Sequence, residues 1–420
     1  MMLRILATML LPLGVSACSG QHVMFAHPNT IPDAPGEARV FLDARGDLYP
    51  KSGLPAVYVL PERANGSLFE AARGADPQLC RDVGFDTEMA ELCAAVAPAC
   101  SGTSTEACFE RWEGVQASIW KRRGEAIAAR FSQSREPTIG VLIHGFNNWY
   151  RESQANYATA EKQFRRFQPD GRDVFFVEVY WDGCRGNDKG IGCWGKAQST
   201  GPLAGFALRQ LFNSVTEARP PVAPQLHWRV LTHSSGAFVA GAIFGDPIAA
   251  LPQLQDPTTN RWYARFAKHR TSDAGPTRIP QLANVKLGMF APATPGITFS
   301  GTQAHRGGIL TRGLTVMTVV QRDDSAVNKL FIGCQRFGAS CLGAKREQVC
   351  ALQSAVASSG TDATVIGYDF TRPKTLWGNE TDLHDYSVYV RQAADKSTFF
   401  RDFMLTGPLP EDAGLLLVCP

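Results

Sequence analysis

The segment from Arg229 to Phe238 constrains the fold of this chain more than any other part of its sequence. An apolar run over residues 226–232 leads into His233-Ser234-Ser235-Gly236, and a run of small and apolar residues follows. This order is typical of a strand that ends in a sharp turn, with a serine hydroxyl exposed at the N-terminus of a helix. A serine hydroxyl becomes a useful nucleophile only when a base accepts its proton. We therefore expect Ser234 to be a nucleophile if the chain also supplies a base, an acid and oxyanion donors.

The part of the chain that begins at Pro137 alternates apolar runs of strand length with segments of helical periodicity. Such alternation predicts an α/β fold in which a mostly parallel sheet is covered by helices on both faces. Ligands of such sheets bind beyond the carboxyl ends of the strands. The expected strands are 138–143, 173–181, 226–232, 284–290 and 314–320, and the expected helices are 151–167, 201–215 and 236–249.

The segment His144-Gly145-Phe146-Asn147 directly follows the first of these strands. An oxyanion hole needs backbone N–H groups that point at the developing negative oxygen, on a stretch of chain that no side chain crowds. Gly145 permits such a conformation. We expect the amides of Phe146 and Ser235 to be the two donors. The alternative is a plain turn in which His144 caps the strand.

A base and an acid are expected later in the chain, in the order serine, aspartate, histidine. Asp323 and Asp324 follow the strand at 314–320, and His384 is the only histidine beyond them. We expect His384 to accept the Ser234 proton and Asp324 to hold the imidazole in one tautomer, with Asp323 as the alternate acid. The alternative is that the aspartates belong to a solvated turn or helix cap and that the histidine lies on the surface.

A second triad and an unusual residue before the turn leave other interpretations open. Asp273 and His305 also respect the chain order, but they leave the aspartates after the strand without a role. Thr232 stands where the common turn pattern has glycine, and this departure favours a catalytically inactive scaffold. We interpret His233 as structural, because adjacent residues at such a turn point in different directions. Four aromatic residues near strand ends either line an acyl pocket or pack in the core: Trp149, Tyr150, Trp181 and Trp194.

Together these motifs resemble the α/β-hydrolase superfamily, in particular its bacterial esterase/lipase-like members of unknown physiological role. The chain departs from the family pattern at Thr232 and at Ala291-Pro292-Ala293-Thr294, which lacks the aspartate often found after that strand. The resemblance implies a serine hydrolase that cleaves carboxylic esters, of acyl-ester or lipid type, through an acyl-enzyme and without a metal or an organic cofactor. The alternative is an inactive hydrolase-like binding or scaffold lipoprotein of the envelope. The resemblance spans residues 137–395, with matches at His144–Asn147, His233–Gly236, Asp324–Val327 and His384–Tyr386.

Residues 1–17 have the pattern of an export signal. Arg4 is their only cation, and the apolar core that follows is too short to span a bilayer. Val15-Ser16-Ala17-Cys18 resembles the bacterial lipobox, so we expect Cys18 to be lipidated (with palmitate) and to open the mature protein. Ser19 resembles the signal that sends such lipoproteins to the outer membrane, which implies an envelope location facing the periplasm. Ordinary cleavage nearby, with Cys18 free or lost, is the alternative.

Four parts follow from these patterns. We expect a signal peptide at 1–17, a lipidated tether at 18–37, a cysteine-rich and largely helical N-terminal extension at 38–136, and the α/β-hydrolase domain at 137–420. Within the extension we expect strands at 38–42 and 56–60, separated by a turn-rich stretch at 43–50. The extension either packs on the main domain or forms an independent module. The formal net charge of +3 over 420 residues predicts no nucleic-acid partner and no polyanionic substrate. The expected partners are a membrane, through the anchor, and a small-molecule or lipid ester.

Ten cysteines remain beyond Cys18, and an even number in an exported chain suggests disulfides. Cys184 and Cys193 bracket a glycine-rich loop and are expected to pair. A zinc site is the competing interpretation, but the sequence has no Cys-x-x-Cys pair and no histidine beside the clusters. The other eight cysteines fall into two pools whose pairing the spacing leaves open: Cys80, Cys93, Cys100 and Cys108, then Cys334, Cys341, Cys350 and Cys419.

Overall fold

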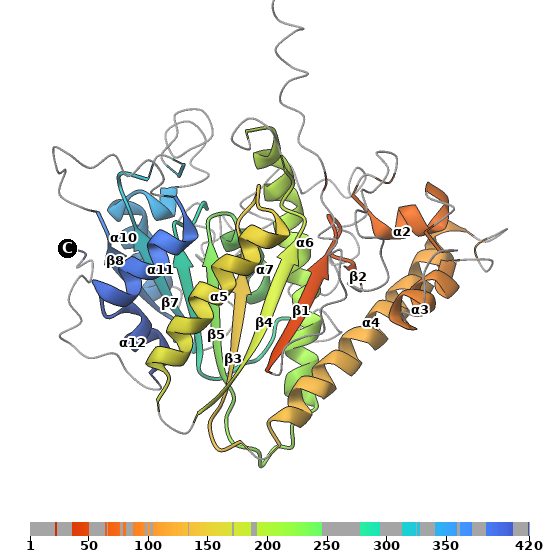
Figure 1. The fold of residues 1–420 in the computed structure, drawn as a ribbon, viewed down its shortest axis with the longest axis horizontal. Coiled ribbons are helices and arrows are strands. Elements are labelled where there is room, and N and C mark those ends of the chain that lie inside the picture. Colours follow the sequence, from red (N-terminus) through yellow and green to blue (C-terminus); the bar gives the residue numbers. More distant parts are fainter. Residues whose placement is uncertain are drawn as a thin grey trace, which may run out of the picture.

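One sheet of eight strands organises the described part of the chain (Figure 1). The structure is a computed structural model that describes residues 22, 36–49, 64, 66–75, 79–80, 87–96, 100, 104–132, 134–169, 172–185, 191–245, 278–294, 313–324, 326–327, 341–358, 362–371, 384–405 and 419. The expected signal peptide and Cys18 lie outside these residues.

The strand order is β2-β1-β4-β3-β5-β6-β7-β8, and every neighbouring pair is parallel except β1 with β2. The expected α/β fold with a mostly parallel sheet is therefore confirmed. The three central strands β3, β5 and β6 are buried along their whole length, as expected for a parallel sheet covered on both faces. β3 is largely apolar, whereas β5 and β6 also bury Arg229 and Lys286. The strands are β1 (Glu37–Leu42), β2 (Leu48–Tyr49), β3 (Pro137–Ile143), β4 (Asp173–Trp181), β5 (His227–His233), β6 (Val285–Phe290), β7 (Thr315–Val320) and β8 (Thr364–Asp369).

Helices cover both faces of the sheet, as expected. In Figure 1, α5 (Tyr150–Phe167), α11 (Tyr386–Asp395) and α12 (Phe399–Met404) lie in front of the strands, while α6 (Ile191–Glu217) and α7 (Gly236–Phe244) lie behind them. The helix expected at 201–215 is longer than expected: α6 begins at Ile191 and continues through Pro202 to Glu217. The remaining helical segments are α2 (Leu68–Glu70), η3 (Ala71–Ala75), α3 (Thr87–Val96), α4 (Thr105–Arg130), η7 (Cys341–Gly343) and α10 (Arg346–Ser358).

The segment expected as an N-terminal extension contributes to the same sheet and the same hydrophobic core. β1 runs parallel to β4, with register partners from Glu37 opposite Phe176 to Leu42 opposite Trp181. α4 packs on α6 so closely that a Cβ at Gly124 would lie 2.4 Å from the Ser214 Cβ. The strand expected at 56–60 lies outside the described residues.

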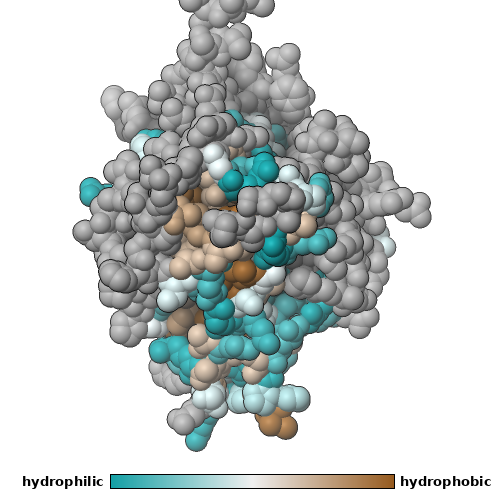
Figure 2. Space-filling model, turned by 90° about the vertical axis from the view of Figure 1, so that its right-hand side faces the viewer, coloured by the Kyte–Doolittle hydropathy of each residue, from teal (hydrophilic) through white to brown (hydrophobic). Residues whose placement is uncertain are grey.

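The side of the molecule that carries α4 exposes both hydrophilic and hydrophobic residues on its described surface (Figure 2). α4 itself alternates buried residues such as Trp112 and Trp120 with charged residues such as Lys121 and Arg122, which pair with acidic neighbours. None of the helices in the described ranges is long and apolar enough to cross a membrane.

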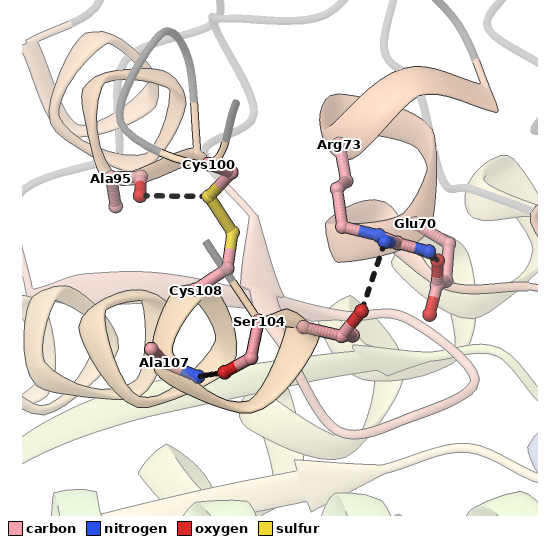
Figure 3. The surroundings of a disulfide bond; sticks show 8 residues. Glu70, Arg73, Ala95, Cys100, Ser104, Ala107 and Cys108 are labelled. Carbon is pink, nitrogen blue, oxygen red and sulfur yellow. Dashed lines mark hydrogen bonds and ion pairs between the residues drawn. A yellow bond between two sulfur atoms is a disulfide. The ribbon is translucent and has the colours of Figure 1, made fainter. Parts of the chain in front are cut away.

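Four disulfides are formed among the described cysteines, and the expected Cys184–Cys193 pair is one of them. The first pool pairs locally, as Cys80–Cys93 and Cys100–Cys108, and the second contributes Cys350–Cys419. Figure 3 shows how Cys100–Cys108 ties the end of α3 to the first turn of α4, where the Ser104 hydroxyl accepts from the Ala107 amide. Cys334 lies outside the described residues.

Candidate active site

Ser234 occupies a tight turn between β5 and α7. Its φ is +52°, in the left-handed region that L-residues rarely adopt. Two backbone hydrogen bonds to the end of β6 and the residues after it hold it there: its amide donates to the Phe290 carbonyl (2.9 Å), and its carbonyl accepts from the Ala293 amide (3.1 Å). A Cβ at Gly236 would lie 2.8 Å from the His144 carbonyl oxygen, so this glycine lets α7 start against the end of β3. The turn is a strained conformation that its surroundings fix.

The structure brings Ser234, His384 and Asp324 together. His384 Nε2 lies 3.0 Å from Ser234 Oγ, and His384 Nδ1 lies 2.8 Å from Asp324 Oδ2. A carboxylate only accepts hydrogen bonds, so Nδ1 carries the proton and Nε2 is left as an acceptor facing the serine hydroxyl. Ser234 and Asp324 are buried, whereas 24% of the His384 side chain is exposed. Ser234, 150 positions from His384, and Asp324, 60 positions from it, therefore form one hydrogen-bonded line with this histidine.

Asp324 is held as a carboxylate. Burial alone would raise its pKa, but the attraction of His384 and the hydrogen bonds from His384 and Tyr389 outweigh burial and lower the pKa to about 2. The Tyr389 hydroxyl donates to the same Oδ2 at 2.6 Å, and the Ala326 amide donates to Oδ1 at 2.8 Å. Asp323, the alternate acid, is exposed.

The second triad that the sequence left open, Asp273 with His305, lies outside the described residues. Tyr389 was missed by the sequence analysis. Its only sequence signal is its place on the buried face of α11, which Tyr386, Val390 and Ala393 share.

The predicted oxyanion donors lie beside the serine. A Cβ at Gly145 would lie 2.9 Å from the Ser234 Cβ, so the segment after β3 passes directly against the turn. The Phe146 amide donates to Ser235 Oγ at 2.7 Å, a contact that the sequence analysis did not foresee. An ester oxygen that accepts from this amide must displace the Ser235 hydroxyl or share the N–H with it. The Ser235 amide stands at the N-terminus of α7, where the helix dipole favours negative charge.

His144 fixes the predicted oxyanion segment, residues His144–Asn147, on β4. Its amide donates to the Tyr157 hydroxyl (2.8 Å), its Nε2 accepts from the Trp181 amide (3.2 Å), and its carbonyl accepts from Trp181 Nε1 (2.8 Å). Burial lowers the pKa of His144 to about 4, so the ring is neutral at neutral pH. His144 is thus more than a strand cap, because it determines where the chain after β3 turns.

Asn147 is held from the other side by the disulfide-bonded loop that follows β4. Its amide donates to the Cys184 carbonyl at 3.0 Å, and the Cys184 amide donates to Asp182 Oδ1 at 2.8 Å. Asn147 and Cys184 both have left-handed φ values, of +62° and +64°. The conformation that presents the Phe146 amide therefore depends on the loop closed by Cys184 and Cys193.

His233 packs against the triad histidine. The two rings are 4.7 Å apart, and one His233 nitrogen hydrogen-bonds to the His384 backbone. Burial, followed by the proximity of His384, lowers the pKa of His233 well below its usual range. A neutral ring that supports the His384 backbone agrees with the structural interpretation of His233.

The four candidate aromatic residues have different surroundings. Tyr150 and Trp181 are buried, against Tyr180 and His144 respectively. Trp194 lies beside the candidate site. Its ring centre is 5.6 Å from that of Phe146 and 5.8 Å from that of Phe238 in α7. Trp149 is 48% exposed, and the Arg185 guanidinium lies 3.5 Å from its ring centre.

Thr232, the departure from the family pattern, is fully buried at the end of β5. Its hydroxyl has no hydrogen-bond partner among the described residues. A β-branched side chain suits a strand end, and a buried hydroxyl without a partner is destabilising.

We expect Thr232→Val to raise the free energy of unfolding by about 1 kcal/mol, because valine keeps the shape and removes the unpaired hydroxyl. Urea denaturation measures this change. Thr200→Val is the matched control, since the Thr200 hydroxyl donates to the Asp182 carbonyl at 2.8 Å and its loss should destabilise the protein. A Thr232→Val protein as unstable as Thr200→Val would contradict the prediction.

No protein-family model and no curated protein sequence matches this chain. One solved structure that resembles it is the Tle1 effector bound to the VgrG spike from the Type 6 secretion system, with 13% identity, a TM-score of 0.17 and 46% of each chain covered. Another is an uncharacterized protein from Pseudomonas aeruginosa, with 12% identity, a TM-score of 0.21, and 49% of this chain and 38% of that chain covered.

The chain thus spans less than half the length of either of these structures. Likenesses this weak are not evidence for a shared activity. Within the described residues, no group of three or more His, Cys, Asp or Glu side chains is arranged to hold a metal ion.

Proposed function

We propose that this chain is a serine hydrolase of the α/β-hydrolase type that cleaves carboxylic esters through an acyl-enzyme on Ser234. The observation that carries the proposal is the hydrogen-bonded line from Ser234 Oγ through His384 to Asp324, at 3.0 and 2.8 Å. A strained serine between a strand and a helix, with an imidazole nitrogen at hydrogen-bond distance from its hydroxyl, is the arrangement that nucleophilic catalysis requires.

The chemistry follows from these contacts. Ser234 Oγ attacks the ester carbonyl carbon while its proton passes to His384 Nε2, and Asp324 stabilises the imidazolium that forms. The carbonyl oxygen becomes an oxyanion, which the amides of Ser235 and Phe146 stabilise. The carbon–oxygen bond to the alcohol then breaks, and His384 returns the proton to the leaving alcohol. Water repeats the sequence on the acyl-enzyme and releases the acid.

We further propose that Cys18 is lipidated and anchors the enzyme in a bacterial envelope membrane. The lipobox-like Val15–Cys18 segment supports this, as do the disulfides, which persist in oxidising compartments. The substrate would be an acyl ester, either a small molecule or a lipid.

Labelling with a fluorophosphonate tests the catalytic proposal. We expect the probe to modify the protein at Ser234 and the modification to vanish in Ser234→Ala. Ser235→Ala is the matched control, because it removes a hydroxyl one residue away and should keep the labelled Ser234. A folded protein that takes up no probe would sink the enzyme proposal and favour the inactive envelope scaffold.

A further inference from the structure

The anchor segment, which runs from Cys18 to His22, is fixed at His22 close to the candidate active site. His22 lies only four residues beyond Cys18. Its Nδ1 is 2.8 Å from Asp182 Oδ2, and its side chain is 17% exposed. A Cβ at Gly66 would lie 2.7 Å from the same nitrogen, so His22 is packed against the body as well as hydrogen-bonded to it.

Asp182 connects this contact to the oxyanion segment. It directly follows β4, and therefore lies at the carboxyl edge of the sheet, toward which the arrowheads of the strands point in Figure 1. Its other carboxylate oxygen accepts from the Cys184 amide, and the Cys184 carbonyl accepts from Asn147. Three hydrogen bonds, through Asp182 and Cys184, thus connect His22 to Asn147 of the oxyanion segment.

The contact shortens the reach of the anchor. A tether that is free from Cys18 to residue 37 spans up to about 65 Å, whereas the stretch from Cys18 to His22 spans at most about 14 Å. With lipid on Cys18, the first case lets the body rotate freely above the membrane. The second case keeps the carboxyl edge of the sheet near the lipid headgroups.

An independent feature of this edge suits a lipid surface. Trp149 and Val222 are the large apolar side chains exposed in the described part of the chain, at 48% and 94%. Trp149 lies at the carboxyl edge, just after the oxyanion segment, with the Arg185 guanidinium 3.5 Å from its ring centre. Tryptophan is enriched at membrane interfaces, and arginine is attracted to anionic headgroups. Val222 precedes β5 and lies toward the opposite edge.

We propose that the His22–Asp182 contact holds the active-site edge against the membrane in which Cys18 is anchored, and that the substrates are acyl esters of lipids in that same membrane. This inference rests on the proposed function and on lipidation of Cys18. The His22–Asp182 contact favours membrane-borne esters over soluble ones, because it keeps the active-site edge close to the lipid headgroups.

Two insertions test the contact, using the full-length lipidated protein in phosphatidylcholine vesicles that contain phosphatidylglycerol. A flexible Gly/Ser insert of about 20 residues adds a mean reach of about 25 Å. Placed between Gly20 and Gln21, it lengthens the anchor segment. Placed between Pro28 and Asn29, it lies beyond the contact and leaves the anchor segment unchanged. The readout is hydrolysis of a fluorogenic phospholipid in the vesicles, divided by turnover of soluble p-nitrophenyl butyrate.

We expect the upstream insert to lower this ratio about tenfold and the downstream insert to leave it unchanged. His22→Ala should lower the ratio even without an insert, because the tether from Cys18 to residue 37 is then free. Equal effects of the two inserts in the unmutated background, or no effect of either, would overturn the inference.

Energy transfer to a rhodamine lipid gives a second readout that does not depend on catalysis. A dye at residue 149 should transfer more strongly than a dye at residue 222, and the upstream insert should remove the difference. Equal transfer from the two positions, or a mature protein without acyl modification on Cys18, overturns the orientation even if Ser234 is catalytic. Loss of the proposed function would appear separately, as turnover of p-nitrophenyl butyrate that persists in Ser234→Ala.

Discussion

Replacing Asp324 with asparagine is expected to lower kcat for p-nitrophenyl butyrate by about 10³- to 10⁴-fold. The asparagine amide has a donor where the carboxylate had only acceptors. It therefore favours the wrong tautomer of His384 and gives no charge to stabilise the imidazolium. Steady-state kinetics on the purified variant measure the loss. Turnover within tenfold of the unmutated enzyme would show that Asp324 is not the triad acid.

Asp323→Asn is the matched control, because the same change one residue away affects an exposed side chain. We expect its kcat to stay within about twofold of the parent, as is usual for exposed positions. Stability must be compared as well. Asp324 has its pKa lowered to about 2, so its stabilising effect is complete above the ordinary pKa near 3.8 and is lost as the pH falls through about 2. Asp324→Asn therefore costs about 2 kcal/mol of unfolding free energy at neutral pH, and kinetics must be taken on folded protein.

The sequence predicted most of the sheet because its central strands are buried on both faces. The strands expected at 138–143, 173–181 and 226–232 correspond to β3, β4 and β5. β8 was not predicted, because it is partly exposed and mixes Thr364, Gly367 and Asp369 with apolar residues. β2 escaped because it has only two residues, within a stretch expected to be a turn. Long buried strands have a recognisable pattern in their own sequence. Short edge strands form because they pair with a neighbouring strand, and their own sequence shows little pattern.

The candidate site divides in the same way. Chain order and strand ends pointed to Ser234, His384 and a pair of aspartates, since the carboxyl ends of parallel strands meet at one edge. The turn after β7 determines which aspartate faces His384. Asp323 and Asp324 are adjacent in sequence, and only the direction of each side chain distinguishes them. The Tyr389 hydroxyl on Asp324 and the Ser235 hydroxyl on the Phe146 amide join elements far apart in sequence. No pattern along the chain encodes such pairs, so only the fold reveals them.

Removing the Cys184–Cys193 disulfide, by serine at both positions, is expected to lower kcat for p-nitrophenyl butyrate by about 10²-fold, the usual effect of losing one oxyanion donor. The Cys184 carbonyl holds the Asn147 amide at 3.0 Å, next to Phe146. Without the cross-link, Cys184 loses a covalent restraint, and the left-handed conformations of Cys184 and Asn147 lose a constraint that maintains them.

The Cys80–Cys93 disulfide supplies the matched control, because it links α3, which packs on α4, to the segment before it. Serine at both of those positions should lower the free energy of unfolding while kcat per labelled Ser234 is kept. Titration with the fluorophosphonate counts the active sites in each preparation, so a catalytic defect is separated from a loss of folded protein. If both double variants kept the same kcat per labelled site, Cys184–Cys193 would stabilise the fold without positioning Phe146. If kcat per labelled site falls only in the variant without Cys184–Cys193, the loop after β4 positions the Phe146 amide through Asn147.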